Sequence, residues 1–245
     1  MDRTFERVLV VVVVSALVVA GAACTEGAGP GADPVGTPPG SRSEAPETVI
    51  PIPEGQSLMD PGRYLAQTQP PIILTTTTPW YGAANVPGFV DFGQLDHFPY
   101  AELFLLNLHE VVRDPGDPGD PWKVRPLPED LLGWLIDHAG LEVVGEVVPV
   151  EIDGFTGQQT DLRVPSNAEC APKQTRPFPA ACLLFFTTQS EPPVFPFAKG
   201  MAYRITVLPD VEGETVTLVY TDYAHRFDSR VGAADEVVRS IEFDV

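Results

Sequence analysis

Proline and glycine divide most of this sequence into short apolar runs. The chain contains 27 prolines and 21 glycines among 245 residues. Because the apolar runs end at Gly, Pro, Asn or Asp, the pattern is typical of β-strands joined by turns. Strands are predicted at residues 72–78, 89–92, 102–108, 141–148, 150–153, 160–164, 182–188, 201–208 and 215–223.

Turn residues predict two hairpins. Residues 150–152 are expected to pair with residues 162–164 across a turn at 154–157, which gives each strand one buried face. A second hairpin is expected at Gly213, within the turn 210–214.

Two segments instead repeat apolar residues at helical spacing. The first covers residues 128–138 and is expected to end near Gly140. The second is expected to begin with Asp228 as its N-cap. The apolar faces consist of Leu131, Leu132, Leu135 and Ile136 in the first helix, and of Val231, Ala234, Val238 and Ile241 in the second. This order of elements predicts an α+β fold, a single antiparallel-rich β-sheet domain over residues 49–245 with two helices packed on it.

The first 24 residues have the layout of an export signal. Arg3 and Arg7 precede an apolar run over residues 8–20, and small residues lead from there to Cys24. The run is shorter than the roughly twenty apolar residues that span a bilayer, which argues against a retained membrane anchor. Cleaved secretion without a lipid is the other alternative.

The sequence Ala22, Ala23, Cys24 resembles the lipobox of bacterial lipoproteins. The resemblance implies a signal peptide at residues 1–23, a lipid on Cys24, and attachment to the outer, extracytoplasmic face of the cell membrane. The Pro- and Gly-rich residues that follow, up to 48, have few large apolar side chains and are predicted to form a disordered linker.

Lipidation of Cys24 leaves Cys170 and Cys182 as a pair outside the reducing cytoplasm. A disulfide persists in that environment, so the two are predicted to be bonded. The bridge closes a loop of about a dozen residues and would stabilise the fold by about 3 kcal/mol. Two buried thiols are the alternative.

The charge of the chain restricts its partners. A formal net charge of −19 opposes binding to nucleic acid, which requires clustered Lys and Arg. It also holds the domain away from an anionic membrane surface. The lipid on Cys24 is therefore the predicted contact with the membrane.

No catalytic residue, cofactor site or metal site is predicted. The four histidines are not paired at helical ligand spacing, and the proline-rich acidic stretch 114–121 lacks the alternating ligands of a calcium loop. No serine lies in a Gly-x-Ser-x-Gly elbow. The histidines are His97, His109, His138 and His225.

Aromatic residues are the candidates for a binding surface. Trp80, Tyr81, Trp122 and Phe195 lie in or near predicted loops, and Tyr and Trp are enriched at binding patches. These side chains are predicted to line one rim of the sheet. Packing in the hydrophobic core is the alternative.

The order of elements resembles the PsbP-like fold, and particularly small lipoproteins of that type from high-GC Gram-positive bacteria. The residues that carry the resemblance are 71–80, the helix at 131–138, the turn at Gly154, and the closing Ser240, Ile241, Glu242 and Phe243. The resemblance implies docking or adaptor roles more often than catalysis.

These inferences lead to a functional hypothesis, a lipid-anchored, non-catalytic domain of the cell envelope that binds an envelope protein or a small apolar ligand. One alternative is an envelope hydrolase that uses carboxylates with His97, His109 or His225. Another is a stabilising subunit of a larger complex.

Overall fold

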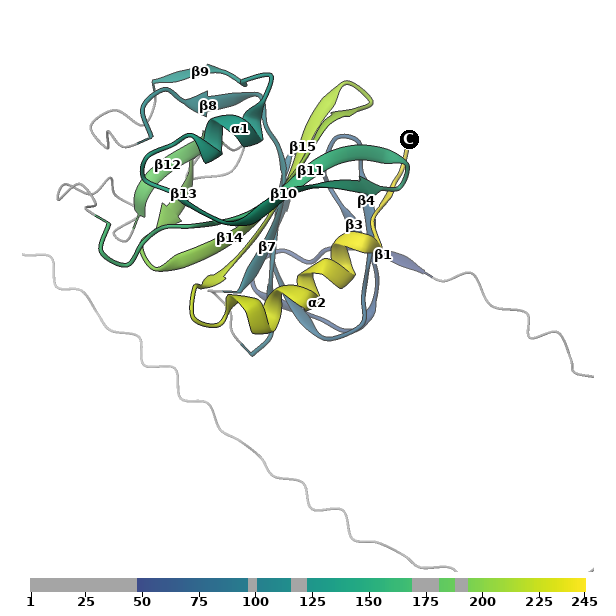
Figure 1. Ribbon diagram of the computed structural model, residues 1–245. Coiled ribbons are helices and arrows are strands. Elements are labelled where there is room, and N and C mark those ends of the chain that lie inside the picture. The colour runs from purple at the N-terminus through teal and green to yellow at the C-terminus, as the bar shows by residue number, and fades with distance from the viewer. Residues whose placement is uncertain (1–47, 97–100, 116–122, 169–180, 188–193) are drawn as a thin grey trace, which may run out of the picture. The chain divides into compact units, whose positions relative to one another are not determined.

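The computed structural model describes residues 48–96, 101–115, 123–168, 181–187 and 194–245 (Figure 1). Its largest sheet has eight strands in the order β10-β11-β14-β15-β7-β6-β5-β2, and every neighbouring pair is antiparallel. These strands are β2 (Ser57–Met59), β5 (Trp80–Val86), β6 (Phe89–Gln94), β7 (Glu102–Asn107), β10 (Glu142–Ile152), β11 (Phe155–Arg163), β14 (Met201–Val211) and β15 (Glu214–Tyr223).

Two four-stranded sheets accompany the large one in the described residues. The first has the order β1-β3-β4-β16, with β1 parallel to β3, and the second has the order β13-β12-β8-β9. Their strands are β1 (Val49–Pro51), β3 (Gly62–Ala66), β4 (Ile72–Thr76), β16 (Glu242–Phe243), β8 (Glu110–Val112), β9 (Val124–Pro126), β12 (Ala181–Thr187) and β13 (Val194–Ala198). The α+β class is confirmed, although the strands are distributed over three sheets.

The helix α1 (Leu131–Ile136) is shorter than the predicted 128–138. It begins late because Oδ1 of Asp130 accepts a hydrogen bond from the backbone N–H of Gly133 at 2.8 Å, which makes Asp130 the N-cap. Within the described residues, no helix has the length and apolar character needed to cross a membrane.

The helix α2 (Phe227–Arg239) has Arg226 at its N-cap, and Asp228 lies in its first turn. The prediction of Asp228 as the cap is therefore wrong, although an acidic residue in the first turn still favours the helix dipole. The helix buries Phe227, Val231, Ala234 and Val237. Val238 is only partly buried, and Ile241 is buried just beyond the helix end.

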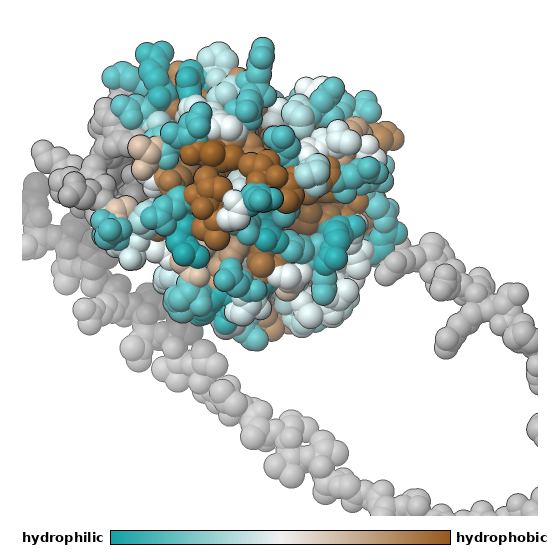
Figure 2. Space-filling view, viewed as in Figure 1, coloured by the Kyte–Doolittle hydropathy of each residue, from teal (hydrophilic) through white to brown (hydrophobic). Residues whose placement is uncertain are grey.

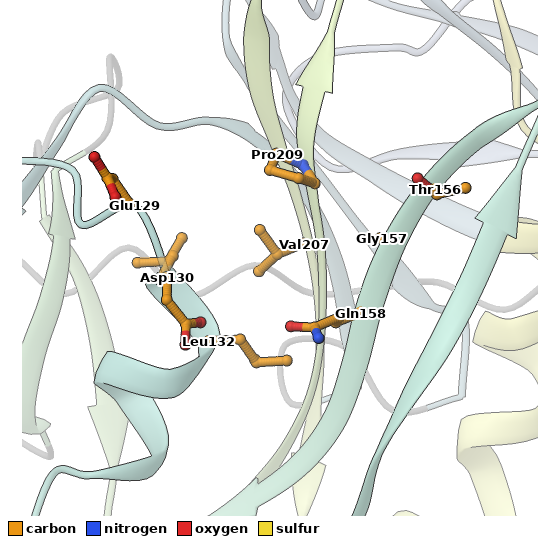
Figure 3. Close-up of a pocket in the computed structure, with 9 residues that line it drawn as sticks. Glu129, Asp130, Leu132, Thr156, Gly157, Gln158, Val207 and Pro209 are labelled. Carbon is orange, nitrogen blue, oxygen red and sulfur yellow. The ribbon is translucent and has the colours of Figure 1, made fainter.

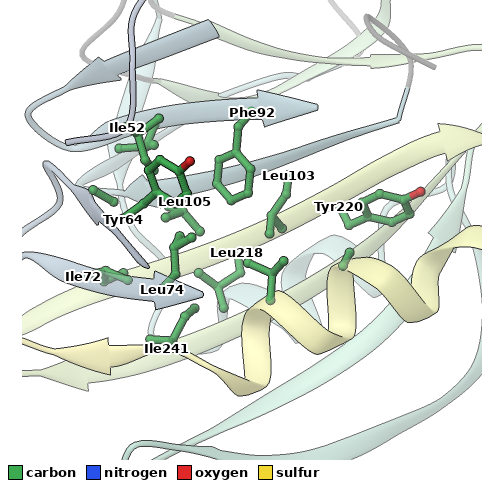
Figure 4. Packing of buried hydrophobic residues seen from close by; sticks show 14 of the residues in the cluster. Ile52, Tyr64, Ile72, Leu74, Phe92, Leu103, Leu105, Leu218, Tyr220 and Ile241 are labelled. Atoms are coloured by element: carbon green, nitrogen blue, oxygen red, sulfur yellow. The ribbon is translucent and has the colours of Figure 1, made fainter. Parts of the chain in front are cut away.

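Alternation along the strands divides the core between the two faces of the large sheet. In β7, Leu103 and Leu105 belong to one cluster, whereas Phe104 and Leu106 belong to the other. The first cluster includes residues of α2 and of the β1-β3-β4-β16 sheet, and Figure 4 shows Ile241 close to Ile72 and Leu74. The second includes residues of α1 and of the β13-β12-β8-β9 sheet. The two helices therefore cover opposite faces.

The hairpin between β10 and β11 corrects the predicted register. Ile152 pairs with Phe155 and Val150 with Gly157, so the predicted turn at 154–157 is wrong. The turn consists of Asp153 and Gly154, with φ of 48° and 82°, the left-handed pair that a two-residue hairpin favours.

The structure joins two of the predicted strands and contains the second predicted hairpin. The predicted strands 141–148 and 150–153 form one strand, β10, with a register shift between Val144 and Val148. The second hairpin is confirmed, because Val211 pairs with Glu214 across Glu212 and Gly213.

Candidate binding surface

The strand β10 presents an apolar surface at one edge of the eight-stranded sheet. On its outer side it has no strand partner among the described residues. Val143, Val147 and Val148 are each 41% exposed and make up half of the six exposed large hydrophobic side chains in the described part. Figure 2 shows hydrophobic residues gathered at the middle of the face where Figure 1 places β10. We call these three residues the valine edge.

A bulge in β10 accounts for the exposure of two consecutive valines. The register of β10 against β11 shifts between Val144 and Val148, and Gly145 adopts φ of 94° within this stretch. A β-bulge inserts unpaired residues and bends its strand. As a result the consecutive residues Val147 and Val148 are both exposed, which regular alternation with one buried face would not permit.

Acidic side chains accompany the valine edge. Glu142, Glu146 and Glu151 are exposed on the same strand. Pro149 also lies in β10, and proline is tolerated in sheets mainly at edge strands because it has no N–H to donate. The edge is therefore apolar and negatively charged, with one backbone donor removed.

A pocket lies one strand further into the sheet, between α1 and the β11–β14 pair. Its volume is about 250 Å³. Figure 3 shows Asp130 on one side and Gln158 on the other, with Val207 between them. The lining residues are Glu129, Asp130, Leu131, Leu132, Thr156, Gly157, Gln158, Val207 and Pro209.

Two glycines permit the local shape of the pocket wall. A Cβ on Gly157 would lie 2.2 Å from the carbonyl oxygen of Val207, so only glycine allows β11 to approach β14 this closely. A Cβ on Gly133 would meet Oδ2 of Asp130 at 2.2 Å. Glycine there lets the Asp130 carboxylate fold over the first turn of α1.

Two half-buried carboxyl groups lie on the same sheet face as α1. Asp91 pairs with Phe104 across β6 and β7, and Glu102 lies two residues before Phe104. Burial raises the pKa of Asp91 to about 7. Burial and the neighbouring charge of Asp91 raise the pKa of Glu102 to about 9. Oδ1 of Asp91 is buried without a hydrogen-bond partner among the described residues.

Sequence reasoning missed this pair. The sequence offered one indication, an aspartate between the apolar residues Val90 and Phe92. The side of the strand that carries Asp91 is covered only when the second core cluster packs against it. Tyr203 lies on the same face, and its pKa is raised by burial and, to a smaller extent, by Glu102.

A buried ion cluster joins β15 to the start of α2. The side chain of Asp222 is fully buried, and its carboxylate oxygens lie 3.6 Å from Nη2 of Arg226 and 3.8 Å from Nε of Arg230. The backbone N–H of Tyr223 donates to Oδ1 of Asp222 at 2.6 Å. Burial raises the pKa of Asp222, while this hydrogen bond and Arg226 oppose the rise. The cluster anchors the helix.

The predicted aromatic rim is not assembled as a surface. Trp80 is 1% exposed and packs edge-on against Phe92, with ring centroids 5.3 Å apart. Phe195 is 4% exposed and contacts Phe104 on the opposite face of the sheet. Both are core residues, because their strands direct them inward. Tyr81 is half-buried, and Trp122 lies outside the described residues.

The histidines occupy separate environments. Nδ1 of His109 lies 3.8 Å from Oε2 of Glu214. Nδ1 of His138 accepts a hydrogen bond from the backbone N–H of Gly140, and burial lowers the pKa of His138. The ring of His225 lies 5.7 Å from that of Tyr223. His97 is outside the described residues.

Several predicted features fall partly or wholly outside the described residues. Among the residues that are described, no group of three or more His, Cys, Asp or Glu side chains is placed to hold a metal ion. Cys182 belongs to β12, whereas Cys24 and Cys170 lie outside the described ranges. The lipid site and the disulfide therefore stay predictions. Most of the acidic stretch 114–121 lies outside as well.

Comparison with known proteins gives distant structural similarities. No family model matches the chain, and no curated protein matches it. The solution structure of cyanobacterial PsbP (CyanoP) from Synechocystis sp. PCC 6803 is 15% identical, covers 77% of this chain and 94% of its own, and gives a TM-score of 0.39. The crystal structure of LpqN, involved in cell envelope biogenesis of Mycobacterium tuberculosis, is 12% identical, covers 80% and 87%, and gives a TM-score of 0.28. Both TM-scores are low, and neither similarity identifies a function for this chain.

Proposed function

We propose that this protein is a lipid-anchored, extracytoplasmic, non-catalytic domain of the cell envelope, and that it binds another protein through the valine edge of β10. The lipid anchor is supported by the signal-like residues 1–23 and by the lipobox resemblance at Cys24. The single observation that carries the binding role is the exposure of Val143, Val147 and Val148 on an edge strand.

The three valines leave apolar area in contact with water. Burial of apolar surface contributes about 25 cal/mol per Å², so three half-exposed valines are an unused source of binding free energy. Exposed apolar side chains on an edge strand are a ready site for pairing with another chain. Here the rim consists of Glu142, Glu146 and Glu151.

The charge of this rim indicates the chemistry of the partner. A second copy of this chain would place glutamates near glutamates, and like charges opposite one another destabilise a strand pair. The whole chain also carries −19 formal charges. A different polypeptide with Lys or Arg among apolar residues would complement both the valines and the glutamates.

Site-specific crosslinking in intact cells tests the binding role. A photo-crosslinking amino acid at Val147 is expected to trap one defined partner, whereas the same amino acid at Leu58 is not. Leu58 is the matched control, because it is 53% exposed and lies on β2, the strand at the opposite edge of the same sheet. Equal products at both positions, or a product with twice the mass of this chain, would contradict the proposal.

Fractionation tests the anchor separately. Cys24→Ser removes the acylated thiol, so the variant is expected in the soluble extracytoplasmic fraction while the parent sediments with membranes. A Cys182→Ser variant controls for the general loss of a cysteine. Equal sedimentation of the Cys24→Ser variant and the parent would rule out lipid attachment as the anchor.

A further inference from the structure

We propose that the partner adds an extended strand to the outer edge of β10, and that this strand carries apolar and basic residues on both of its faces. The inference rests on the proposed function, because it concerns how the valine edge engages its partner. Three observations support it: the faces to which the valines belong, the backbone groups along the edge, and the positions of the acidic side chains.

The valine edge exposes apolar side chains on both faces of the large sheet. Val143 pairs with Leu162, which belongs to the core cluster on the α1 face. Val148 pairs with Gln159, which lines the space beneath α2, and directly paired residues of neighbouring strands project to the same face. A helix or loop laid on one face would cover only one of these valines. A strand added in the plane of the sheet would cover both, because its side chains alternate between the faces.

The backbone of β10 offers hydrogen-bonding groups to such a strand. The residues that flank a two-residue hairpin turn exchange both backbone hydrogen bonds, and the next pair along the strands directs its N–H and C=O groups outward. Ile152 and Phe155 flank the turn formed by Asp153 and Gly154. The register therefore directs the N–H and C=O of Glu151 away from β11, and no strand of the described residues lies on that side.

The same alternation explains the position of Pro149. Its backbone also faces outward, two residues before Glu151, so its missing N–H removes an outer donor and no bond to β11. Bulges, prolines and charges are features by which edge strands resist indiscriminate pairing, and β10 has all three. The edge therefore gives few backbone hydrogen bonds by itself, and the side chains of the partner must supply the remaining affinity and the selectivity.

The acidic side chains of the edge are also divided between the faces. Glu151 pairs with Thr156, which lines the pocket beside α1. Glu142 pairs with Arg163, which follows Leu162 in β11 and therefore projects to the α2 face. A partner strand needs Lys or Arg on both faces to meet these carboxylates, whereas a second copy of β10 would bring glutamates to both.

The test is a titration of the full chain in detergent micelles with the peptide acetyl-Val-Val-Lys-Lys-Val-Val-Lys amide. As an extended strand, this peptide has apolar and basic residues on both faces. Hydrogen exchange of the Glu151 amide, followed by NMR, is expected to slow by about ten-fold or more when the peptide is bound. The matched peptide with Glu in place of every Lys is expected to leave the exchange rate unchanged. Equal protection by both peptides, or protection by neither, would overturn the proposal.

Two substitutions of Glu151 separate the backbone contribution from the charge. Glu151→Ala and Glu151→Pro both remove the carboxylate, but only proline also removes the outward N–H, at an edge position where proline is tolerated. Glu151→Pro is expected to bind the basic peptide about five-fold more weakly than Glu151→Ala, which corresponds to the loss of one backbone hydrogen bond. Equal affinities of the two variants would show that the peptide does not pair as a strand.

Pro149→Ala changes the same edge in the opposite direction. It supplies the missing outer N–H and is expected to strengthen binding of the basic peptide by up to about five-fold, an effect that a folding defect cannot produce. A crosslink at Val147 together with equal affinities of the two Glu151 variants would overturn strand addition and leave the proposed function standing. Slowed exchange at Glu151 without a crosslink at Val147 would contradict the proposed function alone.

Discussion

The two faces of the eight-stranded sheet are closed by different means. On one face, α2 has thirteen residues and is held by ion pairs, because Arg204 of β14 contacts both Asp161 of β11 and Asp235 of α2. On the other face, α1 has six residues and leaves a pocket of about 250 Å³ beside it. The space beneath α2 that Arg204 and Asp235 line has a volume of about 10 Å³.

The treatment of charge also differs between the faces. Beneath α2, partly buried carboxylates pair with arginine, as Asp161 does through two 2.8 Å hydrogen bonds from Arg204. On the α1 face, Asp91 and Glu102 are half-buried neighbours with raised pKa values. The α2 face is thus closed by ion pairs, whereas the α1 face holds two carboxyl groups whose raised pKa values favour their neutral forms and leaves a pocket beside its helix.

The largest expected effect on the free energy of unfolding comes from removing the ion pairs beneath α2. Arg204→Ala removes the partner of Asp161 and Asp235, whose side chains are 20% and 32% exposed. Removing one partner of a largely buried ion pair costs about 3 kcal/mol. Denaturant unfolding is expected to show that loss, and Arg204→Lys is expected to recover only part of it because lysine cannot form the bidentate contact. A loss below about 1 kcal/mol would remove the distinction between the faces.

The second largest expected effect is a pH dependence of stability, which arises from two carboxyl groups on the α1 face. The pKa values of Asp91 and Glu102 rise from 3.8 and 4.5 to about 7 and about 9. The folded state therefore binds more protons than the unfolded state above pH 4, and stability decreases as pH rises. The free energy of unfolding is expected to be highest below about pH 4 and to fall through about pH 7 and then toward about pH 9.

Asp91→Asn tests that assignment. Without the Asp91 carboxyl, the decrease between about pH 4 and pH 7 is expected to become less steep, because only Glu102 still contributes to it, with a gain on the order of 2 kcal/mol at pH 8. Asp210→Asn, on the exposed β14–β15 hairpin, is the control. An unchanged pH profile of unfolding in the Asp91→Asn variant would show that this carboxyl does not titrate as described.

A smaller effect is expected at the start of α1. Asp130→Ala removes the hydrogen bond to the N–H of Gly133 and is expected to cost about 1 kcal/mol in thermal or denaturant unfolding. Asp130→Asn is expected to cost less than about 0.5 kcal/mol, since the cap is retained. Equal losses in the two variants would mean that the charge rather than the cap sustains the short helix.

The smallest expected effect on stability lies at the valine edge. Val147→Ser changes a side chain that is 41% exposed, so the free energy of unfolding is expected to change by less than about 0.5 kcal/mol. Binding to the proposed partner is expected to fall nonetheless. Leu208→Ser, at a fully buried position on β14, is the contrasting substitution and should destabilise the fold by several kcal/mol.

Patterns that act over a few residues were sufficient for much of the fold. The short apolar run at residues 102–108 predicted β7, whose odd and even positions enter different cores. Helical spacing predicted α2 to within a few residues, and Gly213 predicted its turn. These predictions succeed because strand, helix and turn preferences are local properties of the chain.

The candidate sites were not accessible to the same reasoning. Trp80 and Phe195 have side chains suited to either a core or a binding surface, and only the packing of separate strands decides which. The pocket combines Asp130, Gln158 and Val207 from three elements, and no sequence spacing relates these positions. The joint exposure of Val147 and Val148 depends on a bulge that period-2 alternation does not reveal.

Taken alone, the sequence determined the α+β class, most strands and both helices, and it predicts export and lipidation at Cys24. The tertiary structure decided which valines stay in water, which acids are buried together and where a pocket remains. The physical reason is that backbone preference and periodicity act between near neighbours, whereas burial and the electrostatic environment depend on residues that only folding brings together.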